Sequence, residues 1–155
     1  MVPSVNGCNG ATTTATITVN PNPTLAINNT TFTVCDGQTP AITLTNPNTV
    51  AGTQYVWTVV ATNVTGAANQ ATPVAAGAIN TALSLVTANT SGSVVYTIRS
   101  VANGCYSASQ TVTVNVKAIP DAVASNQTIC SGATSSVAIT GIPGQPDAPT
   151  TGVIV

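Results

Sequence analysis

The sequence contains almost no charge. Only 3% of its 155 residues are charged, His and Glu are absent, and the net charge is −1. The charged side chains are Asp36, Asp121, Asp147, Arg99 and Lys117. A surface with so little positive charge does not attract the phosphates of nucleic acids or anionic lipid surfaces. We therefore expect no nucleic-acid partner.

The missing residue types also argue against catalysis and metal binding. A hydrolase needs a nucleophile with a base, or paired carboxylates, whereas the three Asp residues here are dispersed along the chain. A zinc site needs clustered His and Cys, and the sequence has no His and no CxxC pair. We expect no enzymatic activity, no catalytic residue, no cofactor and no bound metal.

Calcium is the one ion that deserves separate treatment, because extracellular β-domains often carry it at the junction between units. Asp36 and Asp121 could each lie near a domain end and supply a carboxylate ligand. An Asp that directly precedes Gly, as Asp36 does, more often forms a turn. We therefore favour the turn interpretation for Asp36.

Long hydrophobic runs are absent as well. The nearest candidate is the short segment PVAAGAI at 73–79, far below the eighteen or so residues that indicate a membrane span. The residues after Met1 lack the basic start and hydrophobic core of a signal peptide. MVPSVNGC at 1–8 instead reads like IRSVANGC at 98–105, so we expect the chain to begin in the middle of a repeat and not to insert into a membrane.

Three short motifs recur in the same order at nearly one spacing. TITVN at 16–20 recurs as TVTVN at 111–115 and TVCDG at 33–37 as TICSG at 128–132, each 95 positions on, while NGC at 6–8 recurs at 103–105, 97 positions on. The sequence therefore predicts a window of roughly 1.6 units from a tandem array. Arrays of this kind usually build length or multivalent surface and not a single catalytic pocket.

The composition favours β-structure. The 29 Thr residues are β-branched, suit extended backbone and stay polar on the wet face of a strand. Apolar and polar residues alternate with the period of a half-buried strand, and turn-forming clusters separate the alternating stretches. The predicted strands are 14–20, 31–34, 41–45, 53–60, 79–86, 93–101 and 109–116, and the Ala-rich stretch 66–82 could carry a short helical turn. This pattern predicts an all-β, antiparallel β-sandwich of immunoglobulin-like build.

The repeat spacing divides the chain into three parts. Residues 23–118 are expected to form one complete domain, residues 1–22 to supply the last strands of a preceding repeat, and residues 119–155 to supply the first strands of a following one. Short proline-bearing linkers should hold consecutive domains semi-rigidly end to end. Trp57, the only Trp, is expected to pack in the core, with an exposed ligand-stacking platform as the alternative.

Four cysteines occupy two equivalent places in the repeat. If each unit carries one cysteine of each kind, Cys35 should bond to Cys105 within the central domain, and Cys8 and Cys130 should pair with neighbouring repeats. Such a bridge would close a loop of 70 residues and stabilise the domain by roughly 4 kcal/mol in the chain-entropy model. Structural disulfides point to an oxidising, extracellular setting.

Several segments resemble a known family. YTIRSVANGC at 96–105, TVTVN at 111–115 and TICSGATSSVAI at 128–139 resemble the PKD-like, Ig-like repeats of very large secreted surface proteins of Bacteroidetes, including adhesins associated with gliding motility. The resemblance implies an extracellular β-sandwich repeat, export through the type IX pathway and a role in adhesion or cell-surface structure. It supplies no catalytic residues.

Two functional classes follow. In the first, the domain is a structural repeat of an extracellular adhesin or filament, its partners are neighbouring copies or repeats of the same protein, and the domains form a head-to-tail row. In the second, its loops bind a surface glycan or protein, which would require an exposed aromatic cluster. Phe32, Tyr55, Tyr96 and Tyr106 are dispersed in the sequence, which favours the first class.

Overall fold

The chain folds entirely as β-structure. The structure, a computed structural model, describes residues 1–124, 126–134, 137–141 and 152–154, and within these residues it contains sixteen strands and no helix. The prediction of an all-β fold is therefore confirmed. The helical turn considered for residues 66–82 is wrong, because two strands form there, β8 (Gln70–Val74) and β9 (Ala78–Ile79). No helix of the described residues could cross a membrane.

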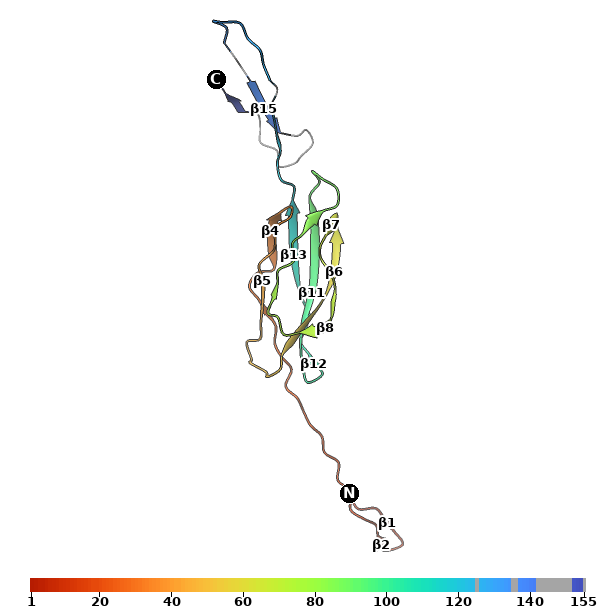
Figure 1. Cartoon of the computed structure of the whole chain (residues 1–155). Coiled ribbons are helices and arrows are strands. Elements are labelled where there is room, and N and C mark those ends of the chain that lie inside the picture. The colour runs from red at the N-terminus through yellow and green to blue at the C-terminus, as the bar shows by residue number, and fades with distance from the viewer. Residues whose placement is uncertain (125, 135–136, 142–151, 155) are drawn as a thin grey trace.

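The central domain consists of two facing sheets (Figure 1). One sheet has the order β3 (Ala26–Ile27), β5 (Ile42–Thr45), β9. The other has the order β4 (Thr31–Cys35), β13 (Gln110–Lys117), β11 (Gly92–Ala102), β6 (Gln54–Thr62), β8, with β12 (Cys105–Tyr106) paired to one end of β11. β7 (Val64–Thr65) and β10 (Ser84–Leu85) form a small separate pair. Five predicted strands thus form as β4, β5, β6, β11 and β13.

One strand pair differs from the predicted antiparallel arrangement. β4 and β13 run parallel, with Thr31 opposite Thr113 and Cys35 opposite Lys117. The pair arises because the chain leaves the first sheet after β3 and crosses directly to the edge of the second sheet. The first strand of the second sheet therefore lies beside the last strand of the domain.

The core depends on period-two alternation along the long strands. On β11 the inward residues Val94, Tyr96 and Ile98 are buried, and on β13 the inward residues Val112, Val114 and Val116 are equally inaccessible. They pack against buried residues of the opposite sheet, which include Ile42, Leu44 and Ile79. Alternation is what an antiparallel sandwich with one wet face per sheet requires.

The predicted strand at residues 79–86 is divided. β9 pairs with β5 in the first sheet, whereas β10 pairs with β7, so the chain changes partners between them. Leu83, fully buried, lies at the crossing, and its backbone exchanges hydrogen bonds with Gly37 and Gln38 at 2.8 and 2.9 Å. A period-two pattern does not reveal which sheet each half joins.

The predicted strand at residues 14–20 does not form. Its counterpart β13 has β11 on one side and β4 on the other, but residues 1–5 correspond only to the end of β11 that pairs with β12, and the sequence holds no equivalent of β4 or of the β11 residues that pair with 111–115. Ile17 and Val19 are consequently 87% exposed. An unpaired strand cannot satisfy its backbone hydrogen bonds or bury its apolar face.

Separate small elements lie beyond the two ends of the sandwich (Figure 1). A hairpin of β1 (Ser4–Val5) and β2 (Cys8–Asn9) lies on the N-terminal side. On the C-terminal side, β14 (Ala122–Ala124), β15 (Val137–Gly141) and β16 (Gly152–Ile154) form a three-stranded sheet. Burial in the central domain begins at Pro23 and extends to Ala118.

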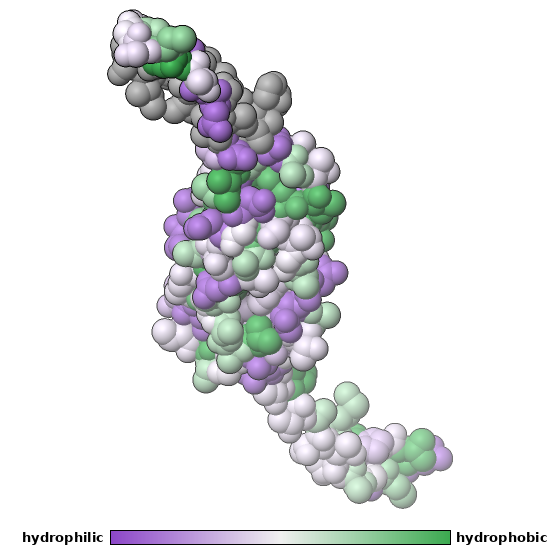
Figure 2. Space-filling view, turned by 45° about the horizontal axis from the view of Figure 1, so that its top comes forward, coloured by the Kyte–Doolittle hydropathy of each residue, from purple (hydrophilic) through white to green (hydrophobic). Residues whose placement is uncertain are grey.

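The surface of the central domain mixes polar and apolar residues (Figure 2). Its most exposed large apolar side chains, Val60 and Val86, are each 69% exposed and lie on different strands or loops. Isolated apolar residues of this kind are normal on the surface of a folded domain.

Tyr96 provides a test of the core. Its hydroxyl is buried and has no hydrogen-bond partner among the described residues, and burial raises the pKa of its phenol. We expect Tyr96→Phe to stabilise the domain by about 1 kcal/mol at neutral pH, because a buried unsatisfied hydroxyl is removed. Denaturant unfolding followed by Trp57 fluorescence measures the change.

The same variant should change how the free energy of unfolding depends on pH in the alkaline range. The unfolded phenol releases its proton near pH 10, whereas folded Tyr96 holds it to higher pH, so the wild-type domain loses stability as pH rises above about 10. Tyr96→Phe should reduce this loss, and the raised pKa of Tyr55 should leave a smaller remainder. An identical alkaline loss in both proteins would contradict the assignment.

Gly66 provides a second test. Its φ is +97°, and a Cβ added there would overlap the carbonyl oxygen of Ala82. We expect Gly66→Ala to cost about 2–4 kcal/mol of unfolding free energy, from backbone strain together with the clash. Gly104 is the matched control, since its φ is +79° but an added Cβ would have nothing within 4 Å. Gly104→Ala should cost about 1 kcal/mol, so equal losses would show that the clash has no effect.

Candidate functional site

The structure separates the two cysteines that were predicted to bond. Cys35 lies opposite Lys117 at the end of β13, and Cys105 lies opposite Ala102 at the far end of β11. Gly92, at one end of β11, pairs with Val116, next to Lys117, so the two cysteines are separated by the length of β11. This length is roughly 33 Å at 3.3 Å per residue. A disulfide requires Cα atoms within about 7 Å. The bond predicted within one domain is therefore wrong for this fold, and the structure leaves Cys8, Cys35, Cys105 and Cys130 as free thiols.

Asp36 forms a turn, as its position before Gly37 indicates. One of its carboxylate oxygens accepts a hydrogen bond from the Leu85 backbone at 2.9 Å, and its own backbone N–H donates to Lys117 at 2.8 Å. The side chain therefore fastens the end of β4 to β10. Among the described residues no group of three or more acidic, Cys or His side chains could hold a metal ion, and Asp147 lies outside those residues.

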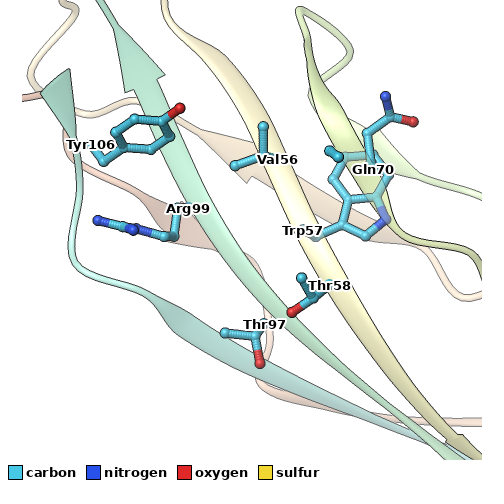
Figure 3. A pocket seen from close by; sticks show the side chains of 8 residues that line it. Val56, Trp57, Thr58, Gln70, Thr97, Arg99 and Tyr106 are labelled. Atoms are coloured by element: carbon cyan, nitrogen blue, oxygen red, sulfur yellow. The ribbon is translucent and has the colours of Figure 1, made fainter. Parts of the chain in front are cut away.

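A shallow groove crosses the outer face of the second sheet (Figure 3). It has a volume of about 200 Å³ and is bordered by β6, β11, β8 and the β12 hairpin. The lining residues are Val56, Trp57, Thr58, Gln70, Ala71, Thr97, Arg99 and Tyr106. The pairing of β6 with β11 brings the residues at the base of the groove side by side, since Thr58 lies opposite Thr97 and Val56 opposite Arg99.

The β11–β12 hairpin builds one end of the groove. Asn103 and Gly104 have positive φ values of 49° and 79°, which is the backbone of a tight hairpin turn, and Asn-Gly is the pair that favours it. The turn folds Tyr106 back over Arg99, whose guanidinium carbon lies 4.9 Å from the centre of the Tyr106 ring. Arg99 Nε also donates to the Ser107 carbonyl at 3.0 Å.

The orientation of Arg99 leaves donors for a ligand. Its Nε is occupied by Ser107, the ring of Tyr106 supports one face of the guanidinium, and within the described part of the chain the terminal nitrogens have no hydrogen-bond partner. A guanidinium fixed in this way can still donate two parallel hydrogen bonds to a carboxylate. The residues that line the groove include no carboxylate, Cys or His, so they offer binding groups and no evident catalytic pair.

Trp57 lies between the two expected environments. It is partly buried and packs against the core, and its indole N–H donates to the Ala68 carbonyl at 3.1 Å. It also lines the groove beside Gln70 (Figure 3). Trp57 and Tyr106, which are distant in the sequence, therefore border one groove. Sequence reasoning missed this grouping, because only the register of β6 and the hairpin after β11 brings the two residues to one groove.

A comparison with protein families agrees with this fold. The family model of the PKD-like domain matches residues 32–120, which is more than half of the chain and runs from the second residue of β4 to just beyond the end of β13. No curated protein matches the sequence. From its sheet order, its core and this match, the chain belongs to the PKD-like domain family.

Proposed function

We propose that the chain is a structural repeat module of an extracellular surface adhesin or filament, in which β-sandwich domains follow one another head to tail. The observation that carries this proposal is the placement of the domain's entry and exit at opposite ends of the sandwich (Figure 1). The chain enters at Pro23 beside the hairpin end and leaves β13 at Lys117, at the opposite end of β11. A further strand, β14, begins at Ala122, so only four residues separate the two strands.

The internal repeats support the same proposal. Residues 16–20 correspond to the paired interior of β13, but in this sequence they lack the strands that flank β13. A complete preceding unit would supply those strands and bury Ile17 and Val19. The natural partners of the domain are therefore neighbouring repeats of the same protein. The resemblance to secreted surface adhesins adds an extracellular location and export through the type IX pathway to the proposal.

An added unit tests the head-to-tail arrangement. Joining residues 1–117 directly to residues 23–155 gives both sandwiches the whole core cluster, from Leu25 to Val116, and puts Pro23 of the second unit in the place of Ala118 of the first. Small-angle scattering should show the maximum dimension growing by roughly 35–40 Å relative to the original chain, the length of the eleven-residue strand β11 plus a short linker. A particle that grows in cross-section without lengthening would contradict the row.

The groove favours a second candidate function, the binding of a surface glycan or protein. Its aromatic residues suit a sugar ring, and the supported guanidinium of Arg99 suits a carboxylate, so a saccharide with an acidic group is the class of ligand it would accept. Complementarity of this kind gives specificity more than affinity in a shallow site.

Charge-matched variants test the groove. We expect any binding to uronic-acid oligosaccharides, measured by calorimetry or on a glycan array, to fall at least tenfold in Arg99→Gln and in Tyr106→Ala. Lys117→Gln removes the only other basic side chain and lies outside the groove, so it should leave binding unchanged. Equal losses in Arg99→Gln and Lys117→Gln would show that net charge, and not the groove, governs binding.

A further inference from the structure

Each described end of the sandwich carries one exposed or half-exposed cysteine. At the exit end, Cys35 is the last residue of β4 and lies opposite Lys117. Phe32 and Val34 of β4 pack against the core, so by alternation Cys35 points to the outer face of the second sheet. Lys117 follows the buried Val116 and points to the same face.

At the entry end, Cys105 lies against the segment that leads into the domain. Its Sγ is 3.9 Å from the carbonyl oxygen of Asn20, and the Asn20 side-chain amide donates to the carbonyl of Asn103 at 3.3 Å. The tip of the β11–β12 hairpin therefore touches the incoming chain at Asn20. This contact joins residues 83 to 85 positions apart.

The repeat spacing places both cysteines at one junction. Displaced by 95 positions, Asn20 corresponds to Asn115 and Asn22 to Lys117. In a preceding unit with this fold, its own equivalent of Cys35 lies opposite Asn22, only two residues from Asn20. The two cysteines thus approach the same short stretch of backbone from two consecutive domains.

The facing of the side chains agrees with this placement. Asn115 lies between the buried residues Val114 and Val116, so its side chain points to the outer face, the face to which Cys35 also points. Asn20, its equivalent, uses that side chain to reach the hairpin that carries Cys105. The hairpin of one unit therefore approaches the preceding unit on the side where the Cys35 equivalent lies.

We propose that the Cys35 position of each repeat and the Cys105 position of the next repeat form a disulfide across the domain junction. The inference rests on the head-to-tail arrangement proposed above and adds a covalent bond to it. The bond forms when two thiols each lose a proton and one electron, and a disulfide oxidant such as oxidised glutathione accepts the two electrons and the protons to give two thiols. Cys8 and Cys130, at the same two positions of the repeat, would then bond to further units on either side.

The two-unit chain described above, residues 1–117 joined to residues 23–155, tests the bond. One variant keeps only Cys35 of the first unit and Cys105 of the second, with every other cysteine changed to Ser. The protein is equilibrated with oxidised and reduced glutathione. We expect the two cysteines to form a disulfide within one molecule, so that neither thiol can be alkylated after the monomer is unfolded. If both thiols stay free in a folded two-unit chain, the proposal is wrong.

Two matched variants control for distance. One keeps Cys35 and Cys105 of the first unit, and the other keeps Cys105 of the first unit and Cys35 of the second. The first pair lies at opposite ends of one domain, and the second pair lies at the two outer ends of the row of two domains. Neither pair should therefore form a bond within a monomer. Equal oxidation in these controls would show non-specific oxidation and would overturn the proposal. Scattering on the same chains separates the outcomes, because an elongated particle without the bond rejects the disulfide alone.

The original chain gives a second measurement that does not depend on the added unit. Asn20→Cys, with Cys8, Cys35 and Cys130 changed to Ser, should form a bond with Cys105, because Asn20 already contacts the hairpin. Thr14→Cys is the control: Thr14 lies six residues earlier, is exposed and has no hydrogen bond to the hairpin among the described residues, so this variant should oxidise far less. Absence of a bond at Asn20→Cys would remove the contact on which the junction depends.

Discussion

The burial of the inward side of β11 is the constraint on which the rest of the structure depends. This strand is paired on both sides, with β6 and with β13, and its inward residues Val94, Tyr96 and Ile98 lie at the centre of the core. The pairing fixes the register of the second sheet, because a slip of one residue would turn these side chains out to solvent. The same register sets Arg99 opposite Val56 on the outer face and so determines the groove.

Sequence reasoning succeeded where alternation alone decides the structure. The stretches 31–34, 41–45, 53–60, 93–101 and 109–116 form strands, because each alternates and finds partners within the domain. It failed where the outcome depends on partners. Residues 14–20 alternate as well as β13 does but have no sheet to join, and residues 79–86 alternate across a change of sheet.

The candidate sites show the same limit. Counting cysteines per repeat identified the two equivalent positions, but the count carries no information about which end of the sandwich each position occupies. Trp57, Arg99 and Tyr106 meet at one groove only because of a strand register and a hairpin turn, so their spacing in the sequence gave no signal. The turn at Asp36 was correctly expected, because the pair Asp-Gly favours a turn through local backbone preferences alone.

Amide side chains do much of the fastening that charged residues do elsewhere. Asn28 bridges β3 and β5 by donating to the Ala41 carbonyl and accepting from the Thr43 backbone, both at 2.9 Å. Asn48 holds the incoming chain through a donated bond to the Asn22 carbonyl at 2.8 Å and accepted bonds from Thr24. Neutral bonds of this kind do not titrate and are little affected by salt.

The parallel pairing of β4 with β13 has a mechanical consequence. When the chain is pulled from its two ends, the force reaches β4 from the entry side at Thr31, which lies opposite Thr113, and it reaches β13 from the exit side at Lys117. The two strands are then drawn past each other along their length, so the hydrogen bonds of five residue pairs bear the load together instead of opening one after another. A domain closed in this way resists tension along its long axis, the direction in which an anchored row of domains would be pulled.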